Sequence, residues 1–184
     1  MKDAAGWVAL AVACAALVAW YLSYTAARLD RIHARVEGAL SALDAQLVRR
    51  AEATLELANA GLLDPASSLL LASAASESLE ASDEHHAGRE AVESNLTDVI
   101  SLALAPDALS ALRDDDGPGA AALRRIAQAN HRVQLARRFH NDAVTDVRRV
   151  RRKLVVRWFR LAGHAEMPRT FEIDDELAVL ERST

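Results

Sequence analysis

The chain opens with a continuous apolar run that ends where regular polar spacing begins. Residues 4–27 read AAGWVALAVACAALVAWYLSYTAA and contain no charged residue. As a helix rising about 1.5 Å per residue, the run is roughly 36 Å long, which exceeds the hydrocarbon core of a bilayer, about 30 Å thick. Trp20, Tyr21 and Tyr24 lie near its end, as is typical of rings at the headgroup level. The pattern predicts a transmembrane helix over 4–27, preceded by a short external N-terminus, 1–3.

A removable secretory signal is the alternative interpretation of this run. Such a signal has an apolar core of only about 7–15 residues and a positively charged start. Here the apolar run is longer, and Lys2 is the only basic side chain before it. The span is therefore the favoured interpretation, with cleavage after Ala26 or Ala27 left open.

An amphipathic helical pattern follows the span directly. Apolar residues recur at intervals of three and four, which places them on one face of a helix. No Gly–Pro break separates this stripe from the span, so we expect one helix that reaches about Ala60, with Gly61 as its stop. The stripe consists of Leu29, Ile32, Val36, Leu40, Leu43 and Leu47.

Four further helical segments are predicted, at about 65–81, 89–104, 107–113 and 120–161. Asp64 and Pro65 have the chemistry of an N-cap and a first helical residue. The segment 82–88 either separates two helices or is a weakly helical stretch inside one longer helix. Pro106 and Asp107 cap the short helix, and DDDGPG (114–119) is the clearest loop. The stripe of the last helix, which Gly163 ends, consists of Ile126, Val133, Phe139, Ala143, Val147, Val150 and Leu154.

The composition indicates an all-α fold. Aromatic residues make up only 4% of the chain, Gly and Pro are few, and no alternating run of useful length suggests a strand. We therefore predict an N-terminal transmembrane helix that continues into an elongated antiparallel helical bundle of about four helices over 28–163. The C-terminal tail, 164–184, is expected to pack loosely or fray.

Charge is strongly segregated along the chain. The net charge is −4, yet residues 148–160, RRVRRKLVVRWFR, contain seven basic residues and no acid. A returning last helix would bring this segment to the bilayer surface, where anionic headgroups attract it. The alternatives are a solvated helix end that complements the helix dipole, or an acidic partner or nucleic acid. The predicted membrane-surface contacts are Arg148, Arg149, Arg151, Arg152, Lys153, Arg157, Trp158, Phe159 and Arg160.

The basic residues beside the span also predict its orientation. Lys2 precedes it, whereas Arg28, Arg31 and Arg35 follow it closely. Because Lys and Arg accumulate on the cytoplasmic side, we expect a single-pass protein of the cell membrane with its N-terminus outside and its C-terminal domain in the cytoplasm.

Sequence motifs for catalysis or cofactor binding are missing. The sequence contains no phosphate-binding glycine loop, no dinucleotide fingerprint and no HExxH. His85 and His86, with Glu84 and Glu90, are the nearest approach to a metal site, but adjacent side chains on a helix point apart. We predict no enzyme activity, cofactor or metal; the expected partners are the lipid bilayer with its anionic headgroups and an unidentified protein, and no nucleic acid is expected.

Two segments resemble the LemA family of bacterial membrane-anchored proteins. They are RVEGALSALDAQLVRRAEATLELAN, residues 35–59, and ARRFHNDAVTDVRR, residues 136–149. Leu40 replaces a family Trp, and the basic run replaces a family Phe-Pro, so the chain looks like a divergent member; its Ala/Arg-rich usage is typical of a GC-rich genome. The resemblance implies an antiparallel helical bundle anchored in a membrane, without an established reaction.

The family-motif residues suggest how the bundle is held in register. We expect charged and amide side chains of the first and last long helices to face each other across the bundle, with Asp44 opposite Arg137. A binding site is the alternative. The residues concerned are Asp44, Gln46, Arg49, Arg50, Arg137, Arg138 and Asn141. The function expected overall is that of a membrane-tethered scaffold or interaction module; a lipid-organising role and a signalling component are the alternatives.

Overall fold

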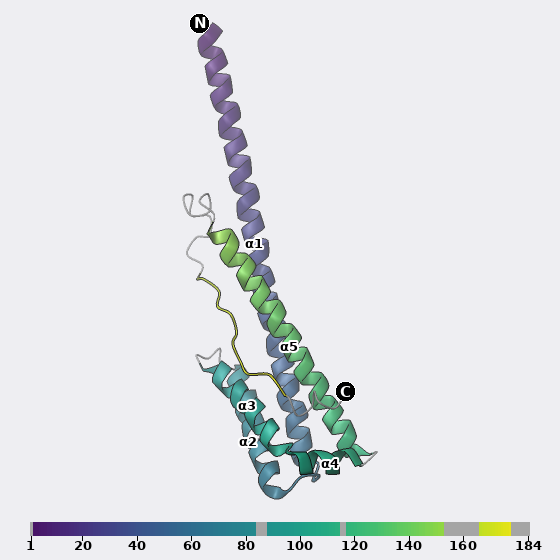
Figure 1. The fold of residues 1–184 in the computed structure, drawn as a ribbon. Coiled ribbons are helices and arrows are strands. Elements are labelled where there is room, and N and C mark those ends of the chain that lie inside the picture. The colour runs from purple at the N-terminus through teal and green to yellow at the C-terminus, as the bar shows by residue number, and fades with distance from the viewer. Residues whose placement is uncertain (1, 84–87, 115–116, 153–165, 178–184) are drawn as a thin grey trace. The chain divides into compact units, whose positions relative to one another are not determined.

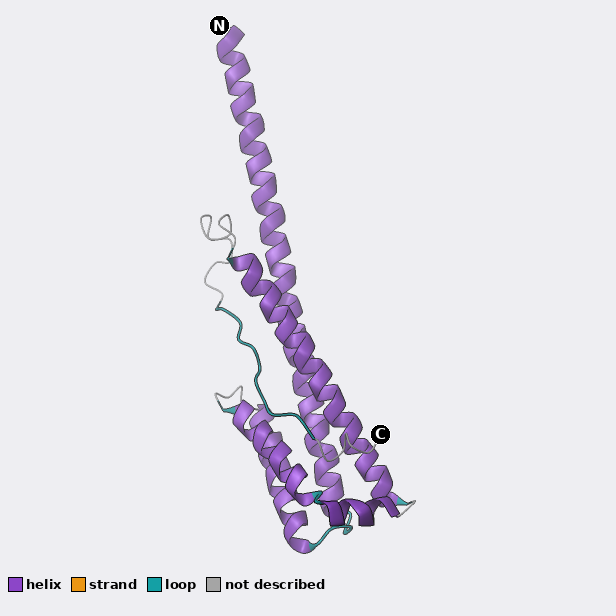
Figure 2. Ribbon diagram, viewed as in Figure 1, coloured by secondary structure: helices purple, strands orange, loops and turns teal. Residues whose placement is uncertain are grey.

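The computed structural model describes residues 2–83, 88–114, 117–152 and 166–177, and these residues form five α-helices and no strand (Figures 1 and 2). The all-α prediction is confirmed, with five helices rather than about four. The helices are α1 (Lys2–Asn59), α2 (Pro65–Asp83), α3 (Arg89–Ala103), α4 (Pro106–Asp114) and α5 (Pro118–Arg151).

The turn between α1 and α2 follows the signals in the sequence. Gly61 adopts a φ of +69°, a left-handed conformation that glycine enters without steric cost. The Asp64 carboxylate then accepts hydrogen bonds from the backbone N–H groups of Ala66 (3.0 Å) and Ser67 (3.1 Å). Hydrogen bonding from Ser67 holds the pKa of Asp64 below its ordinary value of 3.8. The predicted stop, N-cap and first helical residue are confirmed.

The helix is interrupted between α2 and α3, so residues 82–88 separate two helices and are not a weak stretch inside one. Helix α2 ends at Asp83, and α3 begins after Gly88, whose φ is +119°. The two helices lie side by side as a hairpin (Figure 1). Residues 84–87, which include the two adjacent histidines, lie outside the described residues.

Helix α5 begins two residues earlier than predicted, because Pro118 occupies its first position. Gly119 follows in close contact with α4: a Cβ atom at this position would lie 2.9 Å from the Leu112 carbonyl oxygen, so only glycine fits. The helix ends at Arg151, and Arg152 forms a turn. The predicted continuation to 161, with Leu154 and Gly163, falls outside the described residues.

The contacts divide the chain into two compact units. Unit 1 consists of Met1–Gly38 and Asn141–Arg169, and unit 2 of Ala39–His140 and Thr170–Thr184. In unit 1 the stripe of α1 packs on α5 in antiparallel order, since Leu29 contacts Val150 whereas Val36 packs further back along α5. The residues of α5 around Val36 are Ala143, Val144 and Val147.

Unit 2 has a common apolar core to which all five helices contribute. Antiparallel order of α1 and α5 holds here as well, because Glu56 pairs with Arg125 and Arg50 with Asn130. The main cluster of buried residues is Ala51, Leu57, Ala58, Leu71, Ala74, Ala75, Leu96, Ile100, Ala103, Leu104, Leu109, Leu112, Ala122, Leu123, Ile126 and Leu177.

The C-terminal tail corrects the expectation of loose packing. Residues 170–177 form an extended strap in unit 2, with Ile173, Asp175 and Leu177 buried and the residues between them exposed. Ile173 packs on Leu43 of α1 and Val133 of α5. Backbone N–H groups of the strap also donate hydrogen bonds to side chains of α3, so the strap is part of unit 2.

Candidate functional site

The N-terminal part of α1 exposes almost all of its apolar side chains. In the described part of the chain, α1 is the one helix that has the length and apolar composition needed to cross a membrane. None of its apolar window is buried by the rest of the protein. Trp7 and Trp20 are 71% and 69% exposed, and Trp20 stacks on Tyr24.

A fully buried arginine lies at the centre of unit 2. Arg50 is 0% exposed, and its Nη1 group donates hydrogen bonds to Thr97 Oγ1 (3.0 Å) and Asn130 Oδ1 (3.2 Å). Its Nη2 group donates to the backbone oxygen of Glu93 (2.9 Å) and to Glu93 Oε2 (2.8 Å). A single side chain of α1 is thus bonded to both α3 and α5.

Glu93 is equally buried and is shared between several donors. Its second carboxylate oxygen, Oε1, accepts a hydrogen bond from Ser78 of α2 (2.8 Å) and lies 3.7 Å from Arg89 Nε. Arg89, 7% exposed, also donates to the backbone oxygen of Ala81 and lies 3.9 Å from Asp44. The cluster around Arg50 and Glu93 therefore links α1, α2, α3 and α5.

The predicted pairing of Asp44 with Arg137 is wrong. Asp44 faces Arg89 of α3 at 3.9 Å, whereas Arg137 forms a two-pronged ion pair with Asp175 of the strap, at 2.7 and 3.0 Å. The physical reason is that Asp175, which is 3% exposed, is desolvated and requires a cation at close range, and a half-exposed Asp44 does not.

The strap is bonded to α5 at the backbone as well. The carbonyl oxygen of Asp175 accepts hydrogen bonds from Asn130 Nδ2 and from Gln134 Nε2, both at 2.9 Å. Asn130 therefore bonds to Arg50 with its oxygen and to the strap with its nitrogen. This amide joins the Arg50 cluster to the Arg137–Asp175 pair in one buried polar network.

The remaining family-motif residues lie in other surroundings. Arg49 and Arg138 are exposed, and Gln46 is half-buried beside Arg49 in a hollow between α1 and α5. Asn141 is half-buried and belongs to unit 1. The predicted stripe residue Phe139 is 57% exposed, because it projects to the open side of α5 rather than to the core.

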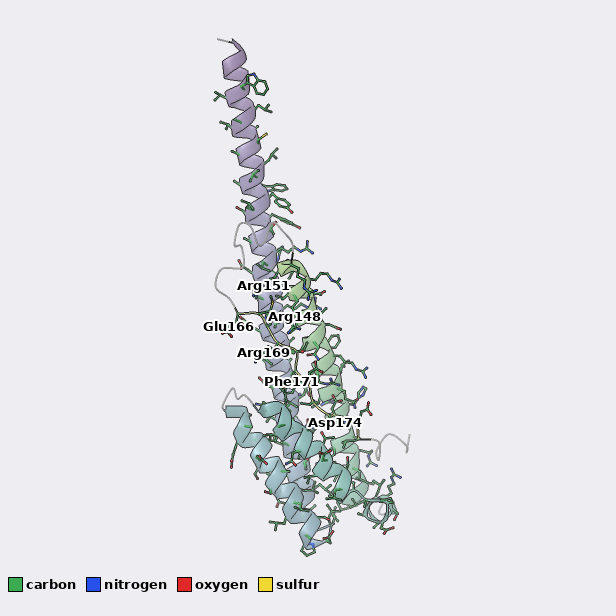
Figure 3. All side chains as sticks on the ribbon, turned by 60° about the vertical axis from the view of Figure 1, so that its left-hand side comes forward. Arg148, Arg151, Glu166, Arg169, Phe171 and Asp174 are labelled. Atoms are coloured by element: carbon green, nitrogen blue, oxygen red, sulfur yellow. The ribbon has the colours of Figure 1, made fainter. Side chains whose placement is uncertain are left out.

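The basic segment is used in part within unit 1. Arg148 donates to the Pro168 carbonyl at 3.2 and 3.0 Å, and Arg151 donates to the Glu166 carbonyl at 2.8 Å, so both cations hold residues that follow the basic segment (Figure 3). Arg149 and Arg152 are exposed. The other predicted membrane contacts lie outside the described residues: Lys153, Arg157, Trp158, Phe159 and Arg160.

Sequence reasoning missed the acids that neutralise Arg50 and Arg137. Glu93 and Asp175 lie 43 and 38 residues away from Arg50 and Arg137 in the sequence. One signal was present: in FEIDDEL, residues 171–177, every second residue faces inward. Such alternation is typical of an extended segment with one buried face.

Metal chemistry has no support in the described part of the chain, where no three His, Cys, Asp or Glu side chains come together. Of the four residues considered for a metal site, Glu90 lies within the described residues, and its carboxylate accepts a hydrogen bond from the backbone N–H of Glu172. His85, His86 and Glu84 lie outside them.

The described residues define a class: they form helices without strands, one of these helices is a candidate membrane span, and the helical part contains a buried polar network. Comparison with known protein families, curated proteins and solved structures finds no match to this chain.

Proposed function

We propose that this chain is a single-pass membrane protein of the LemA type, and that its helical part acts in the cytoplasm as a scaffold that binds another protein. The observation that supports the membrane anchor most directly is the uncovered apolar part of α1, where large side chains such as Trp7, Leu17 and Trp20 are all more than 60% exposed. In water such a surface is unfavourable by about 25 cal/mol per Å², and a bilayer removes this cost.

A scaffold is favoured over an enzyme by the way the polar residues are used. Arg50, Glu93 and Asp175 bond to other side chains and backbone groups inside unit 2. Groups that bond to one another in the interior hold the helices in register and do not reach a substrate. The exposed surface is then the part that is free to bind a partner.

The anchor is tested by fractionating cells that express the full chain. We expect the protein to remain in membranes after alkaline carbonate extraction, and a variant that lacks residues 4–27 to become extractable. An N-terminus that begins at about residue 27 in the mature protein would identify a removed signal and would refute the anchor. Protease protection of a C-terminal tag in spheroplasts tests the cytoplasmic orientation.

The scaffold role is tested by crosslinking and mass spectrometry in native membranes. A reproducible protein crosslinked to unit 2, and lost when the full chain is deleted, is the expected result. If unit 2 yields only crosslinks within the chain itself, the scaffold proposal fails, whereas the anchor proposal is untouched.

A second candidate function is contact with anionic lipid through the basic segment. It is favoured by Arg149 and Arg152, which are exposed at the end of α5. In a variant with Trp7→Phe and Trp20→Phe, Trp158 is the only tryptophan, so its quenching by brominated lipid reports on this segment alone. We expect stronger quenching by anionic than by neutral lipid, and loss of the difference when Arg149 and Arg152 become Gln.

A further inference from the structure

Helices α1 and α5 of unit 2 meet along two seams, and the described residues cover only one of them. On the covered seam Leu43, Leu47 and Val133 are buried, and Ile173 of the strap packs on them. The apolar residues of this seam are thus completed by another segment of the same chain. The opposite seam has no such segment packed on it among the described residues.

The other seam, which we call the open seam, contains a hollow of about 320 Å³. Its lining is mostly apolar and includes three alanines, whose side chains are small. Leu135 and Phe139 stand beside it with 45% and 57% of their surfaces exposed. The lining residues are Ala39, Ala42, Gln46 and Arg49 of α1 and Arg132, Leu135, Ala136 and Phe139 of α5.

The polar groups of the open seam indicate the charge of an occupant. Arg49 and Arg132 are both exposed and line the hollow, and none of its lining residues is acidic. In addition, the side-chain oxygen of Gln46 is buried and has no hydrogen-bond partner among the described residues. The seam therefore offers apolar contacts, two cations and one unused acceptor.

We propose that the open seam binds an amphipathic helix of a partner protein, with large apolar residues on the bound face and acidic residues on its flanks. The inference rests on the proposed scaffold function and names its binding surface. A groove between two helices accepts a third helix through side chains at i, i+3, i+4 and i+7. The acids pair with Arg49 and Arg132, and a polar side chain of the bound face donates to Gln46.

Charge also argues against a second copy of this chain as the occupant. A symmetric dimer would bring the same surface of both molecules together, and the arginines of the two hollows would then share one interface. Like charges in such an interface oppose association. An acidic helix has the complementary charge, so the charge of the hollow favours an acidic helix of a partner protein over a second copy of this chain.

The first experiment uses the full-length protein in nanodiscs of neutral lipid and two synthetic peptide probes. Each probe is a helix of about 20 residues with Leu at i, i+3, i+4 and i+7, and the flanks carry Glu in one peptide and Lys in the other. We expect the Glu peptide to bind roughly tenfold more tightly by fluorescence anisotropy, and the double variant Arg49→Glu, Arg132→Glu to reverse this preference. Equal binding of both peptides would overturn the proposal.

Matched tryptophan variants localise the binding to the seam. Ala42→Trp fills the hollow and is expected to abolish binding of the Glu peptide, whereas Ala111→Trp, at an exposed position of α4 outside the hollow, is expected to leave it unchanged. Both positions are exposed, so neither change disturbs the core. Binding that survives Ala42→Trp would show that the peptide sits elsewhere and would overturn the proposal.

The second experiment places a photo-crosslinking amino acid at Leu135 of the full chain in its native membrane. An adduct that maps to an acidic amphipathic helix of another protein, and that the Glu peptide suppresses, supports the proposal. An adduct to a second copy, an adduct to lipid, or no adduct overturns it. If other positions of unit 2 still crosslink a protein in that case, the scaffold function stands and only its assignment to the open seam is wrong.

Discussion

Loss of the buried Glu93 carboxylate should destabilise unit 2 more than loss of the buried Arg50 guanidinium. Both side chains are fully buried, and they meet at 2.8 Å. Glu93 also lies 3.7 Å from Arg89, so it serves two cations, whereas Arg50 serves one carboxylate. The change Glu93→Gln therefore leaves two buried arginines without a nearby buried anion. The change Arg50→Met leaves one acid that still has a cation.

The magnitudes follow from these contacts. Removing one partner of a buried ion pair costs about 3–5 kcal/mol, and we expect Glu93→Gln to lie in this range. For Arg50→Met, Glu93 keeps the hydrogen bond from Ser78 and the charge of Arg89, so we expect a smaller cost of about 2–3 kcal/mol. The double variant should cost less than the sum of the two single variants, because the charge stranded by one change is removed by the other.

The assay is urea unfolding of the full chain in non-ionic detergent, followed by far-ultraviolet circular dichroism. Tryptophan fluorescence is unsuitable, since Trp7, Trp20 and Trp158 all lie outside unit 2. Glu80→Gln, at an exposed position of α2, is the matched control and should leave stability nearly unchanged. The reasoning is refuted if Glu93→Gln costs no more than Arg50→Met, or if the two changes are additive.

Three further predictions concern the strap and the helix ends. Asp175→Ala removes the acceptor of the two-pronged pair with Arg137, so we expect a loss of about 1.5–3 kcal/mol in the free energy of unfolding and faster proteolysis of residues 170–177. Proteolysis at the wild-type rate would contradict the role of this pair in holding the strap. Gly61→Ala should lower the free energy of unfolding by about 1 kcal/mol, because φ is +69°. Gly38→Ala lies inside α1 with no atom near its Cβ position, so it should raise the free energy of unfolding by about 0.5–1 kcal/mol. Thermal unfolding of both variants measures the two changes. The pKa of Asp64 is lowered in the folded state, so its cap stabilises α2 above the unfolded pKa and is lost as the pH falls through the folded pKa. The protection factors of the amides at the start of α2, which are corrected for the intrinsic pH dependence of exchange, should therefore fall in acid in the wild type, and Asp64→Asn should remove this dependence.

The helix boundaries were predictable because their causes are local. Gly61 needs no partner to adopt a left-handed conformation, and Asp64 caps the N–H groups of residues two and three positions further on. Likewise, the stripe from Leu29 to Leu47 predicted the buried face of α1, since a helix repeats its faces whatever it packs against. The start of α5 was missed by two residues, although Pro118 marked it.

The partners of the charged residues were not predictable in this way. Arg137 has many acids within reach of a plausible fold, and only the path of the strap brings Asp175 to it. The prediction of Asp44 as its partner assumed that α1 and α5 neutralise each other directly. The structure instead brings the acid from the tail, which had been expected to pack loosely. The alternation in FEIDDEL indicated a buried face, but Asp175 at an inward position concealed it.

The buried network also gives a reason why the α2–α3 hairpin packs in one register. The faces of α2 that meet the core are rich in alanine, including Ala74 and Ala75, and small uniform side chains discriminate poorly between neighbouring registers. A shift of α3 by one helical turn would move Glu93 about 5 Å away from Arg50 and leave both charges buried without their partner. The cost of the unpaired charges in such a shift is several kcal/mol. The network therefore favours the observed register of the hairpin against α1.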